Sequence, residues 1–146
     1  MLKTVADIAG VLEARGYEIQ VDASNIITKL GAQANPYTAV LHLGGDKLNI
    51  TCELAKLGEF SEENLSLLAF QALSANTVVD PYAFAIIDSS DDPEIENAED
   101  FTLVLIDTIP TTDLSEEELV FAMDKLWDAL TESVDVLKVG FGKVAV

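Results

Sequence analysis

The sequence predicts one α+β domain in which helices flank an antiparallel sheet, and three observations support this fold class. Apolar residues recur at helical spacing in three segments of the 146-residue chain. Other segments alternate apolar and polar residues, as strands with one buried face do. Short turn sequences separate some of these strands by distances that suit hairpins. The expected element order is α-β-β-β-β-α-β-β-α, and residues 1–146 are expected to form a single domain.

The first part of the chain predicts a helix followed by two strands. Apolar residues spaced i, i+3, i+4 and i+7 indicate the helix, with Thr4 as its N-cap, Asp7 three residues later and Gly16 as the stop signal. Alternation of apolar and polar residues indicates the strands. The expected segments are a helix over residues 4–14, strands over 17–21 and 26–30, a turn over 22–25 and a loop over 31–36.

A hairpin around Gly44-Gly45-Asp46 is the clearest local signal, with strands over residues 37–43 and 47–54. A loop of two or four residues places the apolar side chains of both strands on the same face. That face carries Tyr37, Ala39, Leu41, Leu43, Leu48, Ile50, Cys52 and Leu54. The other face carries Thr38, Val40, His42, Asn49, Thr51 and Glu53. One apolar and one polar face are typical of an antiparallel sheet that is covered on one side.

The middle of the chain predicts a second helix and two further strands. Ser61 is the expected N-cap of a helix over residues 61–74. The apolar stripe of this helix is expected on Leu65, Leu68, Ala69, Ala72 and Leu73. Strands over residues 82–88 and 101–107 are expected to pair across an acidic loop.

A long final helix is predicted after these strands. The segment Ser115-Glu116-Glu117-Glu118 is a capping box at its start, and the helix is expected to end near Gly140. Its apolar stripe is expected on Leu119, Ala122, Met123, Leu126, Leu130 and Val134.

Negative charge is concentrated in one part of the chain. The formal net charge is −18, from 26 acidic and 8 basic residues, and 17 of the acidic residues but no Lys or Arg fall between Leu57 and Asp124. Such a field repels phosphate backbones and anionic lipid surfaces, so nucleic acid and membranes are not expected as partners. A basic protein segment or cations suit this field better, and the alternative is that the charge serves solubility alone.

The sequence indicates a reducing, cytoplasmic location. Cys52 is the only cysteine, so an intrachain disulfide is excluded. The first helix has no continuous apolar segment of the kind found in signal peptides. The longest apolar run, residues 82–87, is far shorter than the ~20 residues of a membrane span.

Residues for catalysis are scarce, and the protein is not expected to be an enzyme. The hairpin register puts His42 and Cys52 on opposite faces and roughly 16 Å apart along the strands, so they do not form a dyad. Gly44-Gly45 lacks the pattern of a phosphate-binding loop and no helix follows it. No catalytic residue, metal ligand or cofactor is therefore predicted.

The acidic stretch within residues 88–107 leaves one alternative open. Its carboxylates loosely resemble the spacing of a calcium loop, but Pro93 stands where that loop needs glycine. These residues are Asp88, Asp91, Asp92, Glu94 and Glu96. A solvated acidic loop is the favoured interpretation, and cation binding by these carboxylates is the alternative.

Three apolar side chains are candidates for binding a partner. Trp127 lies beside the apolar stripe of the final helix, where it either widens the buried face or projects as an interface anchor. Phe121 lies off the same stripe, which suggests a contact surface or a second core face. Val40 is an apolar residue on the otherwise polar face of the hairpin.

Several segments match a known family in order and in short motifs. They are the strands over residues 26–30, 37–43 and 48–54, the helix end Leu73-Ser74-Ala75-Asn76, the strand over 82–88 and the helix entry Asp113-Leu114-Ser115-Glu116-Glu117-Glu118-Leu119. This arrangement resembles the type III secretion chaperones, the Tir-chaperone-like group, in which a similar Leu-x-x-Asn closes the second helix. Tyr82-Ala83-Phe84 stands where these chaperones often have glycine. The chain is also similar to the uncharacterised bacterial YjfI-like family.

The resemblance implies a function as well as a fold. Secretion chaperones are small, acidic, cytoplasmic homodimers that hold an extended segment of another protein. By this resemblance the chain is expected to be a cytoplasmic protein-binding module that pairs with itself or with another protein. The alternatives are a regulator of a neighbouring gene product and a carboxylate-based protein that binds a cation or a small molecule.

Overall fold

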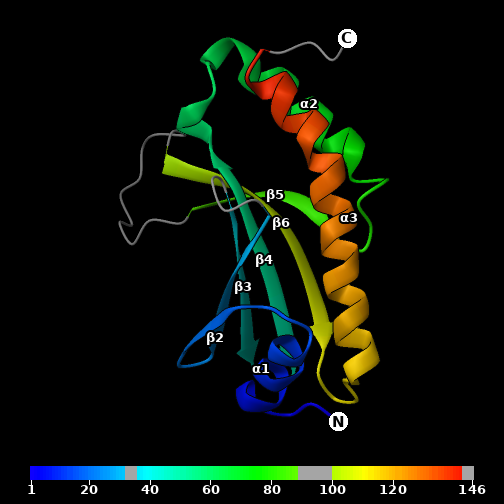
Figure 1. The fold of residues 1–146 in the computed structure, drawn as a ribbon. Coiled ribbons are helices and arrows are strands. Elements are labelled where there is room, and N and C mark those ends of the chain that lie inside the picture. The colour runs from blue at the N-terminus through cyan, green and yellow to red at the C-terminus, as the bar shows by residue number, and fades with distance from the viewer. Residues whose placement is uncertain (32–35, 89–99, 143–146) are drawn as a thin grey trace. The chain divides into compact units, whose positions relative to one another are not determined.

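A computed structural model describes residues 1–31, 36–88 and 100–142. Within these residues the chain forms an antiparallel six-stranded sheet and three α-helices in the order α-β-β-β-β-α-β-β-α (Figure 1). The strand order across the sheet is β1-β2-β3-β4-β6-β5. The predicted α+β class and element order are therefore confirmed.

The elements are α1 (Val5–Ala14), β1 (Ile19–Asp22), β2 (Asn25–Leu30), β3 (Tyr37–Gly44), β4 (Lys47–Lys56), a 3-10 helix (Leu57–Glu59), α2 (Glu62–Ala75), β5 (Ala83–Asp88), β6 (Phe101–Pro110) and α3 (Glu116–Gly140). The chain divides into two compact units, which are described separately. The first contains Met1–Glu53 and Ile106–Met123, and the second contains Leu54–Leu105 and the described part of Asp124–Val146.

Helix α1 begins and ends in the first unit as its sequence predicts. The Thr4 hydroxyl accepts a hydrogen bond from the Asp7 N–H at 3.1 Å. The Asp7 carboxylate in turn accepts from the N–H groups of Lys3 and Thr4, and these bonds lower the pKa of Asp7. Gly16 ends the helix at φ +91°, a conformation that glycine adopts without strain. Because the Tyr17 N–H donates to the Leu12 carbonyl in this cap, β1 begins at Ile19 and not at Tyr17.

The β3–β4 hairpin has one of the two registers that the sequence allowed. Gly44 pairs with Lys47, which leaves a two-residue loop with Gly45 at φ +61°. Leu41 lies opposite Ile50, and both are fully buried. His42 is exposed on the other face, where its Nδ1 lies 2.7 Å from Oδ1 of Asn25 in β2. The predicted apolar and polar faces of the hairpin are therefore confirmed.

In the second unit, the end of α3 packs tightly against residues around α2. Gly140 is buried, and a Cβ atom there would lie 2.7 Å from Cδ1 of Phe60 and 2.9 Å from Cδ1 of Leu68. The rings of Phe60 and Phe141 lie beside this contact, with centroids 4.6 Å apart. Only glycine lets the helix approach this closely.

Helix α2 departs from its predicted pattern in two ways. Ser61 occupies the N-cap position but its side chain makes no capping hydrogen bond. Leu73, expected on the buried stripe, is 70% exposed, because burial centres on Leu68 and Ala72.

Helix α3 has the predicted N-cap, since the Glu118 N–H donates to the Ser115 hydroxyl at 3.1 Å. Its buried stripe differs near the end. Val134 is exposed, whereas Ser133 and Val136 are buried, since successive turns of 3.6 residues move the stripe around the helix. The buried Ser133 hydroxyl donates to the Leu130 carbonyl at 2.7 Å, so its polar group is satisfied.

The thiol of Cys52 predicts a pH dependence of stability. Burial, with the nearby Glu53 carboxylate, raises the pKa of Cys52 from 9.0 to about 12. Between these values the unfolded thiol loses its proton while the folded thiol keeps it. The free energy of unfolding should therefore fall as pH rises above 9.0, by at most about 1.4 kcal/mol per pH unit. Urea unfolding of wild type and Cys52→Ala should show this extra slope in wild type alone, and equal slopes would contradict it.

Two glycine substitutions should have opposite effects on stability. Gly140→Ala should lower the free energy of unfolding by about 1–3 kcal/mol, because its Cβ overlaps the Phe60 ring. Gly10→Ala in α1 is the matched control, since a Cβ there meets no atom within 4 Å. It should raise the free energy of unfolding by about 0.5–1 kcal/mol. Urea unfolding followed by circular dichroism measures both, and a stabilising Gly140→Ala would refute the close contact.

Candidate functional site

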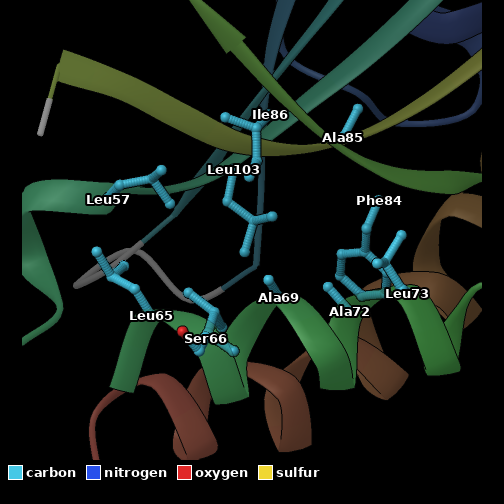
Figure 2. Close-up of a pocket in the computed structure, with 11 residues that line it drawn as sticks. Leu57, Leu65, Ser66, Ala69, Ala72, Leu73, Phe84, Ala85, Ile86 and Leu103 are labelled. Carbon is cyan, nitrogen blue, oxygen red and sulfur yellow. The ribbon is translucent and has the colours of Figure 1, made fainter. Parts of the chain in front are cut away.

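The second unit contains an apolar groove between α2 and the strands β5 and β6, here called the α2–β5 groove (Figure 2). Its volume is about 470 Å³. The lining residues are Leu57, Leu65, Ser66, Leu68, Ala69, Ala72, Leu73, Phe84, Ala85, Ile86 and Leu103. Ser66 is the only residue among them with a polar side chain, so the groove suits an apolar occupant.

Small side chains on α2 create the space. Ala69 and Ala72 lie on the side of the helix that faces the strands (Figure 2). Each presents one methyl group where a larger apolar residue would reach the sheet. Leu68, on the same side of the helix, is buried and holds α2 in place.

The strands supply the opposite wall of the groove. Phe84 and Ile86 are two residues apart in β5 and therefore share one face of the strand. Phe84 is buried, but Ile86 is 52% exposed, and Leu103 of β6 is buried between them and α2 (Figure 2). This wall of the groove is thus buried at Phe84 and exposed at Ile86, so the groove is open to solvent on the Ile86 side.

A hydrogen bond ties the end of α2 to β5. Asn76 is the C-cap of α2, and its Oδ1 accepts from the Phe84 N–H at 2.7 Å. Asn76 closes the Leu-x-x-Asn motif of the sequence, so this motif has a structural role here. It holds the two walls of the groove together at one end.

Exposed apolar side chains extend from the groove over α2. Leu73 lies at the groove, and Phe70 and Leu67 follow at intervals of three residues, so they are neighbours along one side of the helix. Phe70 is 65% exposed, and Leu67 and Ile86 are about half exposed. Neighbouring exposed apolar side chains of this kind are a candidate interaction surface.

The groove could be recognised only in part from the sequence. Leu67 and Phe70 are apolar residues outside the predicted buried stripe of α2. Their position indicates exposed apolar surface on this helix. The space itself depends on how far Ala69 and Ala72 stand from β5, and no local pattern reports that distance.

The three residues predicted to bind a partner lie elsewhere. Phe121 and Trp127 are both substantially exposed on α3. Val40 is half-buried in β3, opposite Ile27 and Thr51. None of the three lines the α2–β5 groove, and their role in binding stays a prediction.

The cysteine and the histidine considered as a catalytic pair lie on opposite faces of the sheet. Cys52 is buried on the apolar face of β4, and His42 is exposed on the opposite face of β3. Cys52 pairs with Ala39, three residues from His42, so the two lie roughly 10 Å apart along the strands and not the roughly 16 Å expected. Among the residues that the structure describes, no three His, Cys, Asp or Glu side chains gather closely enough to hold a metal ion. Four of the carboxylates considered for a cation, Asp91, Asp92, Glu94 and Glu96, lie outside these residues. No described helix has the length and apolar character needed to cross a membrane.

Comparison with known proteins finds a similar fold but no family. No family model and no curated protein matches the chain. The crystal structure of YbjN from E. coli, a candidate transcription regulator, aligns with a TM-score of 0.61 at 8% sequence identity. The alignment covers 94% of this chain and 93% of YbjN. This likeness shows that the α+β fold of the chain occurs in another protein.

The Asn76 hydrogen bond can be tested by two substitutions. Asn76→Ala removes the acceptor of the part-buried Phe84 N–H and should lower the free energy of unfolding by about 1–3 kcal/mol. It should also speed amide hydrogen exchange at Phe84, measured by NMR. Asn76→Asp keeps an oxygen acceptor and should largely preserve the protection. Equal exchange in wild type and Asn76→Ala would show that the bond does not hold β5.

Proposed function

We propose that this protein binds a segment of a partner polypeptide in the α2–β5 groove. The observation that carries the proposal is the groove itself, an accessible apolar space bounded by α2 and β5. Its volume of about 470 Å³ falls within the ~300–1,000 Å³ range of ligand sites. The exposed Phe70 and Leu67 on α2 extend the apolar surface beyond the size of a small ligand, which favours a polypeptide.

The resemblance to type III secretion chaperones supports the same proposal. It implies a cytoplasmic protein that holds an extended segment without catalysis, and it implies a homodimer. The similarity to the YjfI-like family allows such binding outside a secretion system. The exposed aromatic side chains of α3, Phe121 and Trp127, are the surface that we assign to the contact between two copies.

A regulatory role is the second candidate, favoured by the likeness to YbjN in fold. The net charge of −18 argues against direct contact with nucleic acid, because the phosphate backbone would be repelled. A regulator with this charge would act through a protein partner. Binding in the α2–β5 groove would serve that role as well.

The proposal predicts that filling the groove removes a partner. Wild type and Ala69→Leu should be used as bait in an extract of the protein's own cells at low salt. Wild type should retain a partner in a fixed ratio, and Ala69→Leu should retain about tenfold less, which corresponds to about 1.4 kcal/mol of binding free energy.

Ala6→Leu is the control for this experiment, because Ala6 is an exposed residue of α1 in the first unit. It introduces the same side chain on a helix and should leave recovery unchanged. Circular dichroism of each variant checks that it is folded. Recovery of no partner by wild type, or equal recovery by Ala69→Leu, would refute the proposal.

A further inference from the structure

The part of the chain that builds the α2–β5 groove contains acidic residues and no basic residue. No Lys or Arg occurs from Leu57 to Asp124, which includes α2, β5 and β6. Glu62 and Glu63 form the first turn of α2 and are both exposed. Lys56, the basic residue that precedes this stretch, is not within ion-pair distance of either glutamate among the residues described.

These glutamates lie next to one end of the groove. Figure 2 shows Leu65 and Ser66 at that end and Phe84 with Leu73 at the other. Glu62 is three residues before Leu65, so it lies one helical turn away on the same side of α2. An occupant of the groove therefore meets apolar walls along its length and carboxylates where it passes the start of α2.

A second copy of the chain fits this end poorly. In a symmetric pair, the same surface of each copy faces the other. The groove surface of a second copy carries no Lys or Arg, so it would bring no positive charge to Glu62 and Glu63. Charge complementarity favours an occupant that brings positive charge.

We infer that the α2–β5 groove takes a peptide segment whose apolar side chains are flanked on one side by Lys or Arg. The inference rests on the proposed function and specifies its partner. The apolar side chains fill the space beside Ala69 and Ala72. The basic residues lie over the first turn of α2, beside Glu62 and Glu63, where their charges are complementary.

A random peptide-display library is the probe for this inference. It is selected on wild type at low salt and depleted on Ala69→Leu, so that the surviving peptides depend on the groove. We expect these peptides to combine apolar residues with an excess of Lys and Arg over Asp and Glu. A survivor labelled with a fluorophore is then measured by fluorescence anisotropy against purified variants.

Two double variants test the charge. Glu62→Gln with Glu63→Gln should weaken binding about fivefold at low salt, the scale of exposed ion pairs. Added sodium chloride should weaken wild-type binding and affect this double variant less. Glu13→Gln with Glu18→Gln removes two exposed glutamates of the first unit and should leave binding unchanged.

The outcomes separate this inference from the proposed function. Two results would overturn the inference: selected peptides without an excess of Lys and Arg, or equal affinity of wild type and the Glu62 and Glu63 double variant. The proposed function would stand in either case if the extract experiment still finds a partner that Ala69→Leu loses. A wild-type dimer that Ala69→Leu converts to a monomer, measured by analytical ultracentrifugation, would overturn the inference in favour of a second copy. No survivors together with no partner from the extract would overturn both.

Discussion

The register of the β3–β4 hairpin is the constraint on which the first unit depends. Because side chains alternate between faces along a strand, a slip of one residue would exchange the apolar and polar faces. The two-residue loop at Gly45 excludes that slip by pairing Gly44 with Lys47. With this register, Leu41 and Ile50 lie on one buried face of the sheet, which β2 continues by pairing with β3.

In the second unit, close packing around α2 is the main constraint. Gly140 brings the end of α3 against Phe60 and Leu68, and Leu68 belongs to α2. Phe60 lies just before α2, and Asn76, just after it, links the helix to β5. Contacts near both ends thereby hold α2, while Ala69 and Ala72 within the helix leave a space. The groove thus results from a helix that is anchored firmly at its ends and carries small residues in its middle.

Charge and apolar surface occur together in this part of the chain. The described residues that surround the groove carry carboxylates and no basic side chain between Leu57 and Asp124. The exposed Phe70 and Leu73 would favour indiscriminate association on a neutral protein. A negative field of this kind disfavours the approach of anionic macromolecules to the apolar surface.

The sequence by itself determined the fold class, the element order and the faces of the hairpin, because these depend on local periodicity and turn chemistry. It also determined where the charge lies. Only the tertiary structure decided how far the buried side of α2 extends. Helical spacing groups Leu73 with Leu68, and packing against neighbours left Leu73 exposed. The groove was likewise decided by tertiary structure. The sequence places Ala69 and Ala72 on the buried side of α2, but it does not give the distance from their methyl groups to β5.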